Sequence, residues 1–218
     1  TFQDFKFKEN LQKAIDEAGF KEPSPIQIDA IPHILLGKDI VGQAHTGTGK
    51  TAAFGLPVLN QLTGKNAEAV VIVPTRELAM QVSDELFKFG KFLGINTATV
   101  YGGQAYARQL KLIETASVIV ATPGRFLDLL KNGHIKIKPK FVILDEADEM
   151  LDMGFLDDIK EIFTYLPEDR QTLLFSATMP VAIKNLAKTI LKEPEFVTIT
   201  KSDVTNKNIT QTFYVVDE

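Results

Sequence analysis

Short apolar runs alternate with amphipathic stretches over most of the sequence. Five runs have the length and continuous apolar character of strands that are buried on both faces: Ala69–Val73, Thr97–Tyr101, Ser117–Ala121, Phe141–Leu144 and Thr172–Phe175. Apolar residues recur at helical spacing in Glu9–Ala18, Ile26–Leu36, Lys50–Leu62, Glu77–Phe92, Tyr106–Glu114, Gly124–Lys131, Leu156–Leu166 and Val181–Leu191. This alternation predicts an α/β fold with a mostly parallel central sheet, helices on both faces and ligands at the carboxyl ends of the strands.

A glycine-rich stretch, Ala44–Thr51, lies between the apolar run Asp39–Val41 and a helix that begins near Lys50. Such a loop aims backbone N–H groups and a helix N-terminus at one point, and that point attracts phosphate. Lys50 would reach the β- and γ-phosphates, and the Thr51 hydroxyl would ligate Mg²⁺. The loop residues expected around the phosphates are Thr46, Gly47, Thr48 and Gly49. The general pattern has glycine where this chain has Ala44, so the alternative is a chance Gly-Lys-Thr in a surface loop.

A pair of carboxylates follows the strand-like run Phe141–Leu144. Beside a phosphate loop, Asp145 is placed to complete the shell of a Mg²⁺ ion, and Glu146 is placed to orient or deprotonate an attacking water. The alternative is structural, because Asp145 could cap the next helix and Glu146 could favour its N-terminal dipole.

Further polar clusters stand at the ends of predicted strands: Pro74–Ala79, Gly102-Gly103, Thr122–Arg125 and Ser176–Thr178. Each alone is ordinary turn chemistry. Together they would place hydroxyls, glycine backbone and arginines along one edge of the sheet. Such a row can hold a sugar-phosphate backbone without reading its bases.

Composition narrows the class of protein further. The net charge of −4 argues against nucleic acid as a partner, but a sum of charges does not say where they lie. The chain has no cysteine, and its three histidines are scattered, so neither a disulfide framework nor a zinc site is expected. No apolar run is long enough to cross a bilayer, and the opening segment is not a signal peptide. We therefore expect a cytoplasmic protein without a membrane partner.

Taken in order, these motifs resemble those of the DEAD-box family of ATP-dependent RNA helicases, in particular the amino-terminal RecA-like domain. The four residues that give the family its name are Asp145-Glu146-Ala147-Asp148. A glutamine motif, the phosphate loop, Pro-Thr-Arg-Glu-Leu-Ala, Gly-Gly, Thr-Pro-Gly-Arg and Ser-Ala-Thr complete the match, which runs over nearly the whole chain. The resemblance implies a helicase and ATP hydrolase with ATP or ADP and Mg²⁺ as cofactors.

The resemblance also implies a site for the adenine base. Gln27 would select adenine by hydrogen bonds to its edge, and Phe20 belongs to the same motif. The family has an aromatic residue 17 positions before Gly19, so Phe2 would stack on the base. The alternative is that Phe2 only packs against the first helix.

On the RNA side, the resemblance implies backbone contacts from Thr75, Arg76, Gly102, Gly103, Arg108, Thr122, Gly124 and Arg125. Asp148 would contact Ser176 and Thr178 and couple the nucleotide state to a second domain. RNA would be bound without regard to sequence.

The chain is expected to divide into a RecA-like domain at 1–200 and, at 201–218, a linker with the start of a second RecA-like domain. A polar stretch, Lys201–Asn208, precedes the strand-like Thr212–Val216. The alternative is that this last strand joins the edge of the sheet. The family's second domain carries arginines that complete the ATP site, so this chain alone, expected to be a monomer, should bind nucleotide but scarcely hydrolyse it. Two other functions stay open, a P-loop ATPase that remodels DNA or protein and a nucleotide-switched RNA-binding module.

Overall fold

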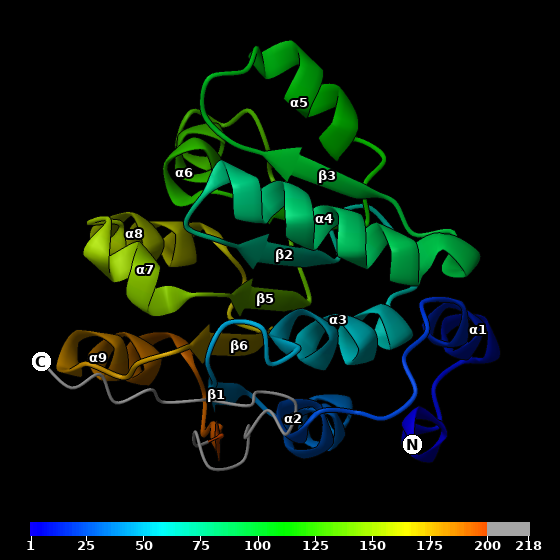
Figure 1. Ribbon diagram of the computed structural model, residues 1–218. Helices are drawn as coiled ribbons and strands as arrows, with labels where there is room; N and C mark the ends of the chain where they lie inside the picture. The colour runs from blue at the N-terminus through cyan, green and yellow to red at the C-terminus, as the bar shows by residue number, and fades with distance from the viewer. Residues whose placement is uncertain (200–218) are drawn as a thin grey trace, which may run out of the picture.

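The computed structural model describes residues 1–199 and contains one seven-stranded sheet in which every pair of neighbouring strands is parallel (Figure 1). The strands are β1 (Ile40–Gln43), β2 (Ala69–Ile72), β3 (Thr97–Val100), β4 (Val118–Ala121), β5 (Phe141–Leu144), β6 (Gln171–Ser176) and β7 (Glu195–Thr198). Their order across the sheet is β3-β4-β2-β5-β6-β1-β7. All the strand carboxyl ends therefore lie at one edge.

Helices cover both faces of this sheet (Figure 1). One face packs against α1 (Glu9–Glu17), α2 (Pro25–Leu35), α3 (Lys50–Gln61) and α4 (Arg76–Gly90). The other packs against α5 (Tyr106–Ile113), α6 (Pro123–Lys131), α7 (Ala147–Asp152), α8 (Leu156–Tyr165) and α9 (Val181–Ile190). Consecutive strand residues alternate between the two cores: on β2, Val71 joins the first and Val70 the second. This two-sided burial is why the strands are continuously apolar.

The five strands and eight helices expected from the sequence are present, with ends that shift by one or two residues. The stretch expected as helix to Phe92 ends as α-helix at Gly90 and continues as a 3₁₀ turn, Lys91–Leu93. A second 3₁₀ turn, Phe2–Phe5, precedes α1. Within residues 1–199, no helix combines the length and apolarity needed to cross a membrane. The predicted domain boundary at 200 and the strand-like Thr212–Val216 lie outside the described residues.

Candidate functional site

The glycine-rich loop connects the carboxyl end of β1 to the first residue of α3. Gly47 and Gly49 have φ angles of 80° and 89°, a region that side chains disfavour, and Gly49 is the residue before the helix. His45, Thr46 and Gly47 are exposed. The Thr48 side chain instead turns inward, where its hydroxyl donates to the His45 carbonyl at 2.7 Å. The loop thus presents backbone N–H groups and the start of a 12-residue helix to solvent.

Lys50 and Asp145 lie beneath this loop, and both are nearly buried, at 6% and 2% exposure. The Lys50 ammonium donates to the Ala44 carbonyl at 3.2 Å, within the loop itself. Burial raises the pKa of Asp145 to about 7, against the opposing effect of the Lys50 charge. A cation bound to this carboxylate would displace the proton that burial favours.

The oxygen donors around Asp145 fit a magnesium ion. Mg²⁺ takes hard oxygen ligands and keeps several waters, so one carboxylate and one hydroxyl suffice from the protein. Within residues 1–199, Asp145 accepts one hydrogen bond, from the Glu146 N–H at 3.0 Å, which leaves capacity for a cation. Glu85 on α4, which was not expected at the site, is a neighbouring charge of Asp145. Burial raises the pKa of Glu85, and a hydrogen bond with Thr51 opposes this effect.

Glu146 has a left-handed backbone, with φ 57° and ψ 53°, and it is the residue before α7. A non-glycine residue in this region carries strain of the order of 1 kcal/mol or more, and such strain gathers at functional sites. The half-buried Glu146 side chain follows directly on Asp145, at the carboxyl end of β5. The Glu146 side chain makes no capping hydrogen bond, but Glu146 is the N-cap residue of α7, where its charge would favour the helix dipole, so both roles of the pair stay open.

Asp148 contacts the segment Ser176–Thr178, as expected. Its backbone N–H donates to the Ser176 hydroxyl at 3.1 Å, and its carboxylate accepts from the Thr178 N–H and hydroxyl, both at 2.9 Å. Burial would raise the pKa of Asp148, but these hydrogen bonds outweigh it and lower the pKa. The end of β6 is thereby joined to the start of α7.

Gln27 links α2 to the phosphate loop. Its Oε1 accepts from the Ser24 N–H at 2.9 Å, and its Nε2 donates to the Gly49 carbonyl at 3.0 Å. The Ser24 hydroxyl donates to the Thr48 carbonyl at 2.8 Å, in parallel with that bond. Each end of the Gln27 amide keeps one further hydrogen-bonding position, since an amide offers two N–H groups and two acceptor lone pairs. Gln27 is 3% exposed, so in this structure its amide braces the loop, and its recognition of a base stays a prediction.

Phe2 is buried in this structure, and its stacking on a base stays a prediction. This side chain is 2% exposed, so a base could not stack on it without a rearrangement of the core. Its ring packs edge-on against Phe20, at 5.9 Å between centroids, and Phe20 packs in the same way on Phe89 at 5.6 Å. Phe2 therefore packs against Phe20 of the glutamine motif, and Phe20 is half-buried.

Arg76 and the glycine pair lie together on the expected RNA side. The Arg76 Nη2 donates to the Gly102 carbonyl at 3.1 Å, and its guanidinium lies 5.0 Å from the ring centroid of Tyr101. Gly103 has φ +85°, and a Cβ there would lie 3.0 Å from the Arg76 Nη2. Thr75 caps α4, since its hydroxyl accepts from the Leu78 N–H at 3.1 Å.

Arg125 lies on the first turn of α6, which begins after Thr122, and Gly124 beside it is exposed. Its Nη1 donates to the Gln104 carbonyl at 2.9 Å and to the Gln109 Oε1 at 3.0 Å. The side chain of Arg108 is exposed on α5 and stands apart from this contact. Gln109, like Arg108, belongs to the stretch after the glycine pair that was assigned to the RNA side. Tyr101, Gln104 and Tyr106 were not expected at the site, and their one sequence signal is their place beside the glycine pair.

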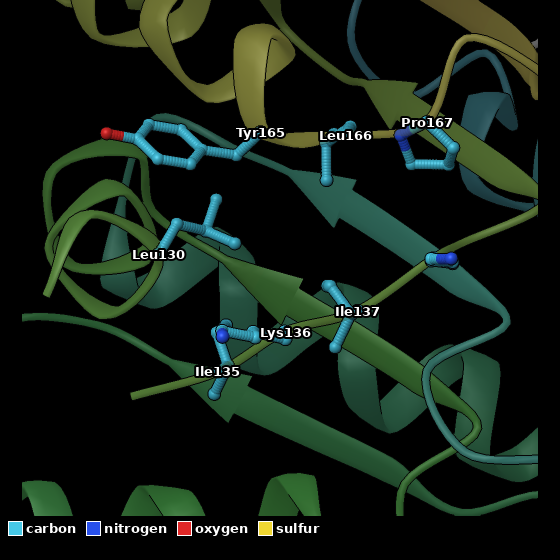
Figure 2. Close-up of a pocket in the computed structure, with 8 residues that line it drawn as sticks. Leu130, Ile135, Lys136, Ile137, Tyr165, Leu166 and Pro167 are labelled. Carbon is cyan, nitrogen blue, oxygen red and sulfur yellow. The ribbon is translucent and has the colours of Figure 1, made fainter. Parts of the chain in front are cut away.

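Strand order separates these residues into two groups along one edge. The nucleotide residues follow β5, β6 and β1, which are neighbours, and the expected RNA residues follow β3, β4 and β2, which are also neighbours. A depression of about 430 Å³ with Leu130, Ile135, Lys136, Ile137, Tyr165 and Pro167 in its lining is separate from both (Figure 2). It lies near the starts of β5 and β6, so it contains none of the expected site residues.

The chain has a glycine-rich loop over a buried lysine, and a buried carboxylate follows a nearby strand of the parallel sheet. This arrangement defines a nucleotide-binding domain of the phosphate-loop class. The chain belongs to the DEAD/DEAH box helicase family, whose model matches residues 24–186. This confirms the resemblance found in the sequence, and neither the ATPase acting on DNA or protein nor the nucleotide-switched module is favoured.

The chain is 57% identical over 221 residues to the DEAD-box ATP-dependent RNA helicase RhpA of Helicobacter pylori, covering 100% of this chain and 45% of that protein. It is 47% identical over 222 residues to the DEAD-box ATP-dependent RNA helicase CshA of Bacillus subtilis, again covering 100% of this chain and 45% of the relative. The chain therefore spans less than half the length of these curated relatives.

Among solved structures, a DEAD box protein from Methanococcus jannaschii superposes with a TM-score of 0.84 at 42% identity, over 88% of this chain and 54% of that one. A hypothetical ATP-dependent RNA helicase from Sulfolobus tokodaii gives 0.83 at 41% identity, over 88% and 57%. These neighbours confirm the α/β fold.

Proposed function

We propose that this chain is the ATP-binding domain of a cytoplasmic ATP-dependent RNA helicase, which binds ATP or ADP with Mg²⁺ and holds an RNA backbone. The observation that carries the proposal is the Gln27 amide, linked to Gly49 directly beside the exposed phosphate loop. It joins a group able to recognise adenine to a group able to bind phosphate. The relatives, named as ATP-dependent RNA helicases, support the same function.

In this proposal the loop N–H groups and Lys50 bind the phosphates, and Thr51 with Asp145 would hold Mg²⁺, which neutralises phosphate charge when bound. Glu146 orients the attacking water and takes its proton. Phe2 would stack on the base, and Phe20 belongs to the same motif. Because the relatives' remaining length would supply a second RecA-like domain with further arginines, this chain alone binds nucleotide and hydrolyses it poorly.

The RNA half of the proposal rests on the strand ends of β2, β3 and β4. Backbone carbonyls and aromatic rings already fix the guanidinium groups of Arg76 and Arg125 there. Thr75, Gly102, Gly103, Thr122 and Gly124 would add hydroxyl and backbone groups toward phosphates and sugars, with Arg108 at the margin. Such contacts carry no sequence information, so binding is independent of RNA sequence.

Calorimetric titration of the chain with ADP and with GDP, both with Mg²⁺, tests the nucleotide half. ADP should release heat, GDP should not, and Gln27→Ala should weaken ADP binding. Because Gln27 also braces the loop, Ser24→Ala is the matched control: it removes the bond to Thr48 but keeps the amide. A Gln27→Ala loss larger than the Ser24→Ala loss supports base recognition. Equal binding of ADP and GDP by the unaltered chain would instead leave only a general phosphate site.

A further inference from the structure

Tyr106 is the first residue of α5 and stands at the border of the expected RNA edge, with 38% of its surface exposed. Its ring centroid lies 4.4 Å from the Arg125 guanidinium carbon. Its hydroxyl is hydrogen-bonded to the Asp128 carboxylate, which lies one turn after Arg125 on α6. One side chain thus spans two helices and covers one face of the guanidinium.

The edge of the same guanidinium is also fixed. Both hydrogen bonds that Arg125 makes within residues 1–199 come from Nη1, to the Gln104 carbonyl and to the Gln109 Oε1. Gln109 is fully buried, and its Nε2 donates to the Tyr101 carbonyl at 2.7 Å, which sets the direction of Oε1. The Nη2 and Nε N–H groups keep their capacity for a ligand, because an arginine has five donors.

A guanidinium fixed in this way suits phosphate, which takes paired N–H donors. A free surface arginine loses rotamer entropy when a ligand orders it, whereas one held in advance loses much less. The Tyr106 ring and the Gln109 side chain therefore orient the Arg125 guanidinium before any ligand binds.

We propose that Tyr106 is a positioning residue that orients Arg125 toward an RNA phosphate through the contact of its ring with the guanidinium. This inference rests on the proposed function, since it needs RNA along this edge. Tyr106 acts through Arg125 and does not itself need to touch RNA.

A double-mutant cycle tests this coupling. Binding of a fluorescein-labelled decamer of uridine to the chain at low salt is followed by anisotropy for the unaltered chain, Tyr106→Ala, Arg125→Ala and the double variant. Tyr106→Ala should weaken binding about threefold to tenfold, the size of a cation–π contact that is partly desolvated. In the Arg125→Ala background it should have no further effect.

Two controls make the cycle specific. Tyr106→Phe keeps the ring on the guanidinium and should bind RNA within about twofold of the unaltered chain, since the hydroxyl contact with Asp128 is outside the RNA edge. Tyr165→Ala removes a tyrosine of similar exposure, 43%, from the depression of Figure 2, and should leave RNA binding unchanged. ADP titration of every variant checks that the nucleotide side stays folded.

A readout without RNA keeps the two proposals separate. In ¹⁵N NMR spectra of the chain, the Arg125 Nη1–H signals, from the group bonded to Gln104 and Gln109, should stay protected from exchange in the unaltered chain and in Tyr106→Phe, and lose protection in Tyr106→Ala. Equal Tyr106→Ala effects with and without Arg125, or unchanged protection in Tyr106→Ala, would overturn the inference. If the unaltered chain binds ADP but no RNA, the RNA half of the proposed function fails, and this inference fails with it.

Discussion

The carboxylate of Asp148 accepts two hydrogen bonds from a single residue, Thr178, one from its N–H and one from its hydroxyl, both at 2.9 Å. Asp148 is the second residue of α7, the helix that follows the carboxylate pair, and Thr178 lies between β6 and α9. A displacement of α7 would therefore shift the start of α9. This link joins the helix that follows Asp145 and Glu146 to the segment that follows β6.

Loss of the Thr178 hydroxyl should destabilise the folded chain less than loss of the Asp148 carboxylate. Thr178→Val deletes one donor and should lower the free energy of unfolding by about 1 kcal/mol, whereas Asp148→Ala strands several donors and should cost about 2 to 3 kcal/mol. Urea unfolding measures both. Thr164→Val is the control, since its hydroxyl also donates to a nearby carbonyl, at 2.7 Å, but lies on an exposed helix face. A Thr178→Val effect no larger than that of Thr164→Val would contradict this prediction.

Because Glu146 has a left-handed backbone, variants at this position can distinguish its structural role from its chemical role. Glu146→Gly should be more stable than Glu146→Ala by about 1 kcal/mol, because glycine adopts this conformation without strain. Thermal unfolding gives the comparison. In a protein that also carries the second domain, both variants and Glu146→Gln should bind ATP and lose turnover. Turnover that survives in Glu146→Gln would refute its role toward water.

Two glycines of the phosphate loop offer a matched pair. Both have positive φ, but a Cβ at Gly49 would lie 2.4 Å from the Gln27 Nε2, whereas a Cβ at Gly47 meets nothing within 4 Å. Gly47→Ala should cost about 1 kcal/mol for backbone strain alone, and Gly49→Ala about 2 to 4 kcal/mol, because the Gln27 contact must also move. Differential scanning calorimetry would show the difference. Equal losses of stability in the two variants would mean that the Gln27 side chain moves away from the new Cβ at no energetic cost.

Glu68 makes stability depend on pH. Burial would raise its pKa, but hydrogen bonds from Lys140, Thr63 and Lys65 lower it from 4.5 to about 2. A group whose folded pKa is depressed stabilises the protein fully above its unfolded pKa, and this stability is lost as pH falls from about 4.5 toward 2. The shift corresponds to about 3 kcal/mol, since one pKa unit is about 1.4 kcal/mol.

Urea unfolding of the unaltered chain and of Glu68→Gln between pH 7 and pH 3 tests this dependence. The unaltered chain should be the more stable at pH 7, and the gap should narrow below pH 4.5. A gap that stays constant with pH would assign the effect to packing and not to ionisation.

Local pattern was enough to predict most of the elements and the residues of the phosphate loop. The run from Phe141 to Leu144 is buried on both faces, so its composition alone identifies a strand. The loop before Lys50 depends on glycines that are adjacent in the sequence, and the carboxylates follow their strand directly. Such features need no knowledge of what packs against them.

Features that depend on distant partners could not be predicted in this way. Phe2 is buried against Phe5 in its own turn and against Phe20 beyond α1, and its own segment does not indicate the contact with Phe20. The sequence placed Gln109 with Arg108 after the glycine pair, but its full burial against Arg125 and the Tyr101 carbonyl depends on residues of other elements. Strand order is also absent from the sequence pattern, because each parallel pairing joins segments separated by a helix.

The strand that leads into the phosphate loop is the one whose neighbours are synthesised last. β1 pairs with β6 on one side and β7 on the other, and Asp39, just before β1, bonds a residue 133 positions later, Thr172. During translation the phosphate loop is therefore synthesised early, but β1 can pair on both sides only after β6 and β7 have been synthesised. Pairings of such long range form slowly. The strand before the phosphate loop therefore gains both of its neighbours only after nearly all of residues 1–199 have been synthesised.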